Sequence, residues 1–179
     1  MLQIDADDVV TPAFRDAVEP LLRNQPSEAA FAFYRRSVLL GRPMTHGGWR
    51  YTVPNLLHKE RARYEGLVHE RPVVQGTIGR LDAEIAHHPC EDLGVFCARQ
   101  NRYTTLQAQE MFQRLGRLPE RDIRRHLRRA PLKTFWKSYV RKGGHREGMH
   151  GLVFALFFAG VDFIKWMKYW ERTLQPPAP

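Results

Sequence analysis

The first eight residues, Met1-Leu2-Gln3-Ile4-Asp5-Ala6-Asp7-Asp8, decide how the rest of the chain is interpreted. Mostly apolar positions lead directly into an acidic cluster. Alternate side chains of an extended strand lie on one face, so Asp5 and Asp7 are expected side by side at a strand end. Paired carboxylates suit a divalent cation such as Mg²⁺, which binds one or two protein carboxylates together with substrate phosphate oxygens. The alternative is that Asp7 and Asp8 favour the start of the helix indicated by Thr11-Pro12.

The composition is that of a folded chain with an uneven distribution of charge. The 179 residues are 43% apolar, which is enough for one domain with a core. Cys90 and Cys97 match no zinc or redox pattern, which favours a reducing, cytosolic compartment. Residues 114–146 contain twelve Lys or Arg against two acidic residues, and therefore carry the whole surplus of +9. Such a block attracts nucleic acid, anionic lipid or a phosphorylated substrate, or is simply a solvated helical face.

The first half of the chain is predicted to contain one helix followed by strands. A helix begins at Pro12, which follows a capping threonine, and its apolar residues recur at helical spacing. Residues 29–40 are rich in Phe, Tyr, Val and Leu and indicate a strand. A second extended segment covers 50–59, where Pro54 argues for an edge or bent position. Two shorter strands are expected within 73–86.

The second half is predicted to be helical. Asp92 and Thr104-Thr105 each precede a run of apolar residues, and the second of these helices is expected to end at Gly116. Pro119 and Pro131 both stand where a helix can start.

The last helix, over 151–170, is almost continuously apolar. Its polar residues recur every three or four positions and form one narrow stripe: Asp162, Lys165, Lys168 and Arg172. These interruptions argue against a span across the bilayer. The helix either packs inside protein or lies in the membrane interface, and the preceding basic block favours the interface because stable attachment usually needs about two binding signals.

Several separated stretches occur in the order of motifs in a known enzyme family. The chain resembles the family 2 glycosyltransferases of the lipopolysaccharide-core type. The stretches that carry the resemblance are 2–8 (LQIDADD), 45–49 (THGGW), 67–70 (LVHE), 85–88 (IAHH), 91–93 (EDL), 100–105 (QNRYTT), 144–151 (GHREGMHG) and 165–171 (KWMKYWE). Asp8 stands where the family usually has Glu, and Glu147 stands where it has Asp.

The resemblance implies an α/β fold that corresponds to the C-terminal part of a GT-A-like nucleotide-sugar transferase, with a short mixed sheet followed by a helical C-terminal region. The expected organisation is a catalytic and acceptor-side part over 1–90, a helical region over 91–174 and a disordered tail over 175–179. In the family a nucleotide-binding α/β half precedes the Asp-x-Asp strand. Met1 lies within that strand, so we expect the chain to lack this half.

The activity implied by the resemblance is sugar transfer, with inversion, from a nucleotide-sugar to a lipid-linked or core oligosaccharide. Asp5 and Asp7 are expected to bind the donor, and Asp7 together with His87 to hold Mg²⁺ or Mn²⁺. Glu70 is the expected general base for the acceptor hydroxyl. Without the resemblance, Glu70 reads as a surface carboxylate, and for His87 a structural role is as plausible as a ligand role.

Acceptor binding is expected from His46 and Trp49, since an indole can stack on a sugar face, although an anchoring Trp is the plainer interpretation. The expected location is cytoplasmic, peripheral to the inner face of the cell membrane, with contact to anionic lipid and no nucleic acid. The alternative is a non-catalytic basic fragment that binds an anionic membrane surface or nucleic acid. Nucleic-acid binding would weaken steeply with salt and would not need Asp5 or Asp7.

Overall fold

The computed structural model describes residues 1–24, 26–65 and 71–174. The chain divides into two compact units: unit 1 comprises Met1–Thr45 and Trp49–Pro89, and unit 2 comprises His46–Gly48 and Cys90–Pro179. The expected α/β organisation, with a short sheet followed by C-terminal helices, is confirmed. The predicted tail over 175–179 lies outside the described residues.

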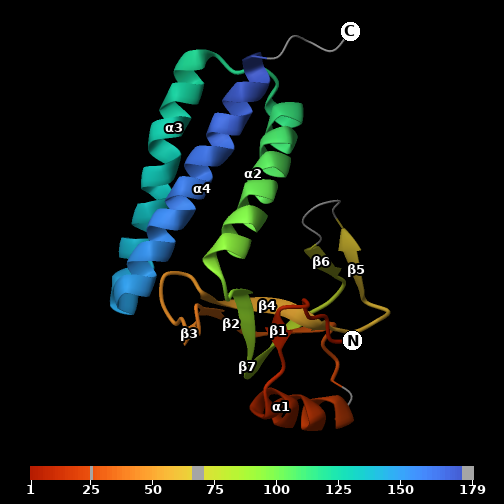
Figure 1. The fold of residues 1–179 in the computed structure, drawn as a ribbon. Helices are drawn as coiled ribbons and strands as arrows, with labels where there is room; N and C mark the ends of the chain where they lie inside the picture. Colours follow the sequence, from red (N-terminus) through yellow and green to blue (C-terminus); the bar gives the residue numbers. More distant parts are fainter. Residues whose placement is uncertain (25, 66–70, 175–179) are drawn as a thin grey trace. The chain divides into compact units, whose positions relative to one another are not determined.

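Unit 1 combines a short sheet with one flanking helix (Figure 1). Its elements are β1 (Asp8–Val9), α1 (Pro12–Arg23), β2 (Ala30–Leu39), β3 (Arg42–Pro43), β4 (Arg50–Leu57), β5 (Ala62–Glu65), β6 (Arg71–Val74) and β7 (Ile78–Cys90). The main sheet has the order β1-β7-β2-β3, with β4 also paired to β2, while β5 and β6 form a separate hairpin. The β1–β7, β2–β3, β2–β4 and β5–β6 pairs are antiparallel.

The core of unit 1 forms where α1 covers the apolar face of the sheet. Phe14 of α1 packs edge-on against Phe33 of β2, with ring centroids 4.8 Å apart. Phe31, Leu56 and Ile85 complete this buried cluster. The helix from Pro12 and the strand over 29–40 are therefore confirmed, because both the capping signal and the apolar pattern agree with the packing.

The N-terminal stretch differs from its prediction, because residues 5–8 form a turn that leads into β1. The backbone N–H of Asp8 donates to the Asp5 carbonyl at 3.0 Å. Asp5 and Asp7 are therefore part of a turn and are not alternate residues of one strand. Thr11 is the cap of α1, with its hydroxyl accepting from the Phe14 N–H at 3.1 Å. The Asp7 and Asp8 side chains are therefore not needed to cap this helix.

Pro54 lies at a bend, as predicted. Phe33 pairs with Val53, whereas Phe31 pairs with Leu56, so the register shifts between these two positions. Since proline has no N–H for the ladder, a bulge is the position in β4 where it costs least.

Unit 2 is helical, and α2, α3 and α4 run side by side (Figure 1). Its elements are α2 (Leu93–Leu115), α3 (Glu120–Phe135), the π-helical turn η1 (Trp136–Arg141), the 3₁₀ turn η2 (Gly144–Glu147) and α4 (Gly148–Leu174). Asp92 caps α2 and Gly116 ends it, as predicted. Thr104-Thr105 and Pro131 do not start helices: the threonines lie inside α2, and Pro131 lies inside α3.

The tip of the three-helix unit is held by aromatic packing and one hydrogen bond. Trp166 and Tyr169 of α4 pack with Ala108 of α2 and Ile123 of α3. The Tyr169 hydroxyl donates to the Gly116 carbonyl at 2.7 Å, which satisfies a carbonyl at the C-terminus of α2. Each of the three helices therefore contributes to one cluster.

A close backbone approach places η2 against the start of α4. A Cβ added at Gly151 would lie 1.8 Å from the Gly144 carbonyl oxygen and 2.8 Å from its carbonyl carbon. No side chain fits there unless the backbone moves. Gly160, further along α4, has nothing within 4 Å of the same added atom.

The polar stripe of α4 faces its neighbouring helices. Asp162 accepts a hydrogen bond from the Thr134 hydroxyl of α3. Lys168 donates to the carbonyl and side-chain oxygens of Asn101 on α2, both at 2.6 Å. The opposite face of α4 exposes large apolar side chains: Met149, Leu156, Phe163, Ile164, Met167, Trp170 and Leu174.

This helix is also the one candidate for a membrane span in the part of the chain that the structure describes. The helical segment Gly144–Leu174 is long and apolar enough by length and composition, and an 18-residue window within it has a mean hydropathy of 1.4. Core helices of soluble proteins meet the same criterion, but only 22% of this window is buried inside the protein.

Candidate active site

The acidic residues of the N-terminal turn meet His87 and Arg35 at one end of the sheet in unit 1. Antiparallel pairing of β1 with β7 places Asp8 opposite His87. The His88 N–H donates to the Asp7 carbonyl at 2.7 Å, which fixes the turn beside β7. Buried positions alternate along β2, so Arg35 continues the face that Phe33 begins. The polar cluster is therefore an extension of the apolar face.

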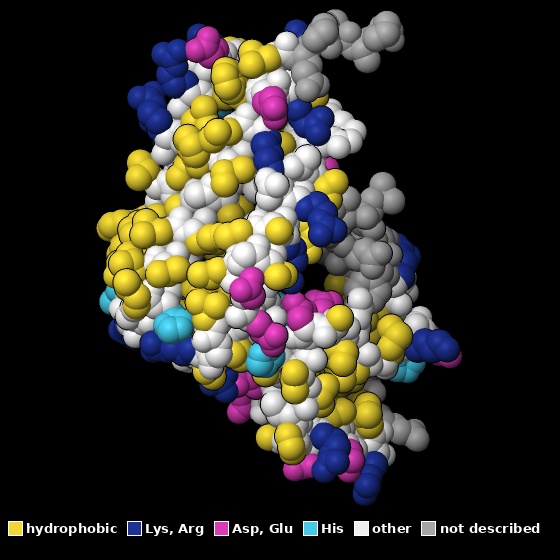
Figure 2. All heavy atoms as spheres, in the orientation of Figure 1, with side chains coloured by type: hydrophobic (Ala, Val, Ile, Leu, Met, Phe, Trp, Pro, Cys, Tyr) yellow, Lys and Arg dark blue, Asp and Glu magenta, His cyan; other side chains and the backbone are white. Residues whose placement is uncertain are grey.

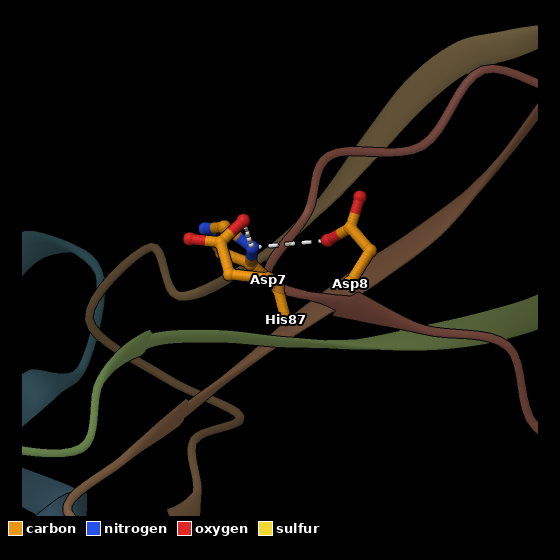
Figure 3. A group of neighbouring side chains, drawn as sticks. All are labelled: Asp7, Asp8 and His87. Carbon is orange, nitrogen blue, oxygen red and sulfur yellow. Dashed lines mark hydrogen bonds and ion pairs between the residues drawn. The ribbon is translucent and has the colours of Figure 1, made fainter.

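The contacts within the cluster are short. The His87 Nδ1 lies 3.0 Å from Asp8 Oδ1 and 3.3 Å from Asp7 Oδ1, and Figure 3 shows the two carboxylates on either side of this nitrogen. The Arg35 Nη2 lies 2.5 Å from Asp5 Oδ2, 2.7 Å from Asp8 Oδ1 and 3.9 Å from Asp7 Oδ1. Its Nε donates to Asp8 Oδ1 at 2.8 Å. One guanidinium thus faces three carboxylates.

Exposure decreases inward through the cluster. The Asp5 side chain is 57% exposed, that of Asp7 30%, and that of Asp8 only 1%. Burial, followed by the charge of Arg35, lowers the pKa of His87. Burial acts against the charge of Arg35, but hydrogen bonds and charge interactions, chiefly with Asp5 and Asp8, outweigh it and raise its pKa. The cluster therefore holds a permanent cation, and this charge together with burial disfavours protonation of the His87 ring.

This geometry joins three predicted residues and adds two that sequence reasoning missed. Asp5, Asp7 and His87 were expected at the site, whereas Arg35 and the buried role of Asp8 were not. A signal was present: two adjacent arginines occur within an apolar strand. Since side chains alternate, one of them had to face the core and needed acidic partners there.

The other predicted site residues lie elsewhere or outside the described chain. His46 belongs to unit 2, where its N–H and ring Nδ1 contact the buried Glu147 carboxylate at 2.7 and 3.1 Å. Trp49 belongs to unit 1 and is half-buried, with its carbonyl accepting from the Ser37 N–H. Glu70, the predicted general base, lies outside the described residues.

The cluster has the donor set of a site for a hard divalent cation. Asp7, Asp8 and His87 each offer a ligand atom, and these atoms lie within 4.8 Å of one another. Carboxylate oxygens suit Mg²⁺ and Mn²⁺, and imidazole binds a metal through a neutral ring nitrogen. The depressed pKa of His87 keeps that nitrogen neutral. Comparison with known proteins assigns no identity to this arrangement, since no family model and no solved structure matches the chain.

Proposed function

We propose that this protein is a family 2 glycosyltransferase with a GT-A-like fold. It moves a sugar from a nucleotide-sugar donor, with inversion, to a lipid-linked or lipopolysaccharide-core oligosaccharide. The order of the sequence motifs supports the family. The observation that carries the proposal is the meeting of Asp7 and His87, whose Oδ1 and Nδ1 atoms lie 3.3 Å apart although the residues are far apart in sequence.

The residues at this site fit the Mg²⁺ or Mn²⁺ ion that the proposal requires. Asp7 and His87 would hold the cation, and Asp8 offers a further oxygen. The cation supplies positive charge that offsets the charge developing on the diphosphate leaving group. Asp5, with its carboxylate more than half exposed, is the residue available to contact the donor's ribose or sugar.

The remaining roles rest on the resemblance. Glu70 acts as the base that accepts the proton of the acceptor hydroxyl as that oxygen attacks the anomeric carbon. His46 and Trp49 bind the acceptor. The Glu147 carboxylate fixes the His46 ring, since it accepts from the backbone of the same residue and contacts its Nδ1.

Metal-dependent donor binding is the first test. Nucleotide-sugars are titrated into the full chain by calorimetry, with Mn²⁺ and with EDTA. We expect Mn²⁺ to be required, and Asp7→Asn and His87→Ala each to weaken Mn²⁺ binding beyond the roughly 10- to 100-fold that loss of an outer-shell partner costs. Asp82→Asn is the matched control, because Asp82 is an exposed carboxylate on the same strand as His87. Metal-independent binding, or wild-type affinity in Asp7→Asn, would contradict the proposed site.

A transfer assay tests Glu70. The Glu70→Gln variant keeps the shape of the side chain but cannot accept the proton. We expect it to bind donor and Mn²⁺ like the wild type and to lose transfer. Unchanged turnover would remove Glu70 from the mechanism.

We also propose that unit 2 attaches the protein to the cytoplasmic face of the membrane. The support is the orientation of α4: its polar residues bind α2 and α3, while its large apolar residues point outward. We call Met149, Leu156, Phe163, Met167 and Trp170 the outer face of α4. These residues recur at helical spacing on one side of the helix and are each at least 42% exposed.

Basic residues supply the second attachment signal. Figure 2 shows hydrophobic side chains gathered over the end of α3 and the start of α4, beside Lys and Arg side chains. Leu132 and Trp136, 70% and 62% exposed, add to the apolar surface, and Lys133 and Lys137 follow them in sequence. Each Lys or Arg near an anionic surface contributes about 1 kcal/mol, so the basic block complements anionic lipid.

Vesicle sedimentation tests the attachment. We expect binding to vesicles of anionic phospholipid at low salt, weaker binding at high salt, and little binding to neutral vesicles. The double variant Leu156→Glu with Phe163→Glu should abolish binding. Val95→Glu is the matched control, because Val95 is 71% exposed on α2, away from the outer face of α4. Equal binding by the double variant would contradict this surface, and salt-sensitive binding to DNA or RNA alone would favour the nucleic-acid alternative.

A further inference from the structure

The guanidinium of Arg35 lies where the donor atoms of the candidate active site converge. Its Nη2 is 2.7 Å from Asp8 Oδ1, 3.0 Å from His87 Nδ1 and 3.9 Å from Asp7 Oδ1. These are the three residues whose ligand atoms form the candidate cation site. The position that a divalent cation needs is therefore already approached by a positive group of the protein.

This positive group is permanent and well anchored. Arginine does not lose its proton in proteins. The Arg35 side chain is only 10% exposed, and its Nε and Nη2 both contact Asp8 while Nη2 also contacts Asp5. A divalent ion among the same ligands would lie a few ångströms from the guanidinium, and like charges at that distance repel strongly outside bulk water. Both cations cannot keep the same contacts.

We propose that Arg35 is the counter-ion of the cluster before a divalent cation binds, and that binding of the cation at Asp7 and His87 makes the Arg35 guanidinium withdraw from these two residues. This inference rests on the proposed function, because it concerns the cation of that site. Asp8 keeps the Nε contact, so Arg35 does not need to leave the cluster. Once it has withdrawn from Asp7 and His87, the guanidinium can also donate to an oxygen of the donor's diphosphate, an anion that guanidinium groups bind well.

The charge of the cluster is compatible with this exchange. Three carboxylates face one guanidinium, so their formal charges leave an excess of two negative charges. A divalent cation matches that excess. Arg35 in its present position screens the cluster and therefore weakens the attraction that the cation experiences.

Mn²⁺ affinity in an Arg35 variant tests the inference without any measurement of transfer. Free Mn²⁺ is followed by electron paramagnetic resonance during titration of the wild type, Arg35→Gln and Arg36→Gln. Arg36 is the matched control, because it follows Arg35 on the opposite face of β2 and pairs with Glu84. We expect Arg35→Gln to bind Mn²⁺ at least about tenfold more tightly, since removal of a nearby like charge favours the ion, and Arg36→Gln to match the wild type.

A second measurement uses the unaltered side chain, in case Arg35→Gln fails to fold. The side-chain Nε–H signals of the wild type are recorded by NMR during addition of Mg²⁺, with the Arg35 signal assigned by its loss in Arg35→Lys. We expect the Arg35 signal to shift and that of Arg36 to stay in place. A folded Arg35→Gln variant with wild-type Mn²⁺ affinity, or an Arg35 signal that ignores bound Mg²⁺, would overturn this inference alone. Absence of metal binding in the wild type and in Arg35→Gln would overturn the proposed cation site as well.

Discussion

Substitution of Gly151 tests whether the close approach of η2 to α4 limits the stability of unit 2. In Gly151→Ala the new methyl would lie 1.8 Å from the Gly144 carbonyl oxygen, which is well inside van der Waals contact. The obstacle is backbone, so it cannot rotate away. Overpacking of this kind costs about 1–3 kcal/mol, and the rigid obstacle places the cost at the upper end of this range.

Part of this cost is offset, because alanine is better than glycine inside a helix by about 0.8–1.0 kcal/mol. The expected net loss is therefore roughly 2 kcal/mol. Gly160→Ala is the matched control, since it is the same change in the same helix with nothing within 4 Å of the new atom. This variant should gain up to about 1 kcal/mol.

Thermal unfolding followed by far-UV circular dichroism measures both variants. For a chain of 150–250 residues, 1 kcal/mol corresponds to about 2–4 °C in Tm, so we expect Gly151→Ala to fall by roughly 4–8 °C and Gly160→Ala to rise by roughly 2–4 °C. Equal Tm values for the two variants would refute the packing argument. Equal values would also mean that the close approach of the Gly144 carbonyl does not explain why residue 151 is a glycine.

Three further predictions concern individual side chains. Lys168→Met removes the donor to Asn101 and Thr104, and we expect unit 2 to lose about 1–3 kcal/mol in urea unfolding, because hydrogen bonds to a charged group are lost; unchanged stability would show that water replaces the lysine. Asp92→Ala removes the acceptor of the Val95 N–H, and a loss of about 1 kcal/mol in the same assay is expected for this helix cap, whereas a neutral result would contradict the capping role. Burial raises the pKa of the Cys90 thiol, while Cys97 is exposed. A thiol reagent at pH 8 should therefore modify Cys97 rapidly and Cys90 only on unfolding. Rapid modification of both thiols in the folded protein would contradict this prediction.

Local signals in the sequence predicted the elements whose causes are local. The cap at Thr11, the apolar strand over 30–39 and the cap at Asp92 each act within a few residues, and the structure confirms them. The predictions that failed concerned residues whose role depends on the rest of the helix and on the helices packed against it. Thr104 resembles a helix cap, yet inside α2 its hydroxyl donates to the Asn101 carbonyl, so it needs no helix end. Pro131 resembles a helix start, but it lies inside α3, a helix that packs along α4.

The candidate site was predictable only in part, because its composition depends on strand register. The acidic pair and His87 were expected together through the family resemblance. Arg35 enters the cluster because β2 lies next to β7 in the sheet and turns this side chain to the covered face. Neither the neighbour of a strand nor its register can be read from the strand alone. The polar stripe of α4 is a comparable case. Its spacing could be recognised from the sequence of the helix alone, whereas the helices that it faces, α2 and α3, could not.

The membership of residues His46–Gly48 in unit 2 has a consequence for experiments that divide the chain. A cut after Pro89 would separate Glu147 from the backbone N–H of His46, which donates to it at 2.7 Å, and Ser138 from the Gly47 carbonyl. A recombinant 90–179 fragment would therefore lack the His46 N–H that donates to this buried carboxylate. During synthesis, His46 leaves the ribosome about a hundred residues before Glu147, to which it donates. At about 5–20 residues per second, this delay is about 5–20 s. The helical unit is thus discontinuous in sequence, and one of its segments is translated well before the helices that it contacts.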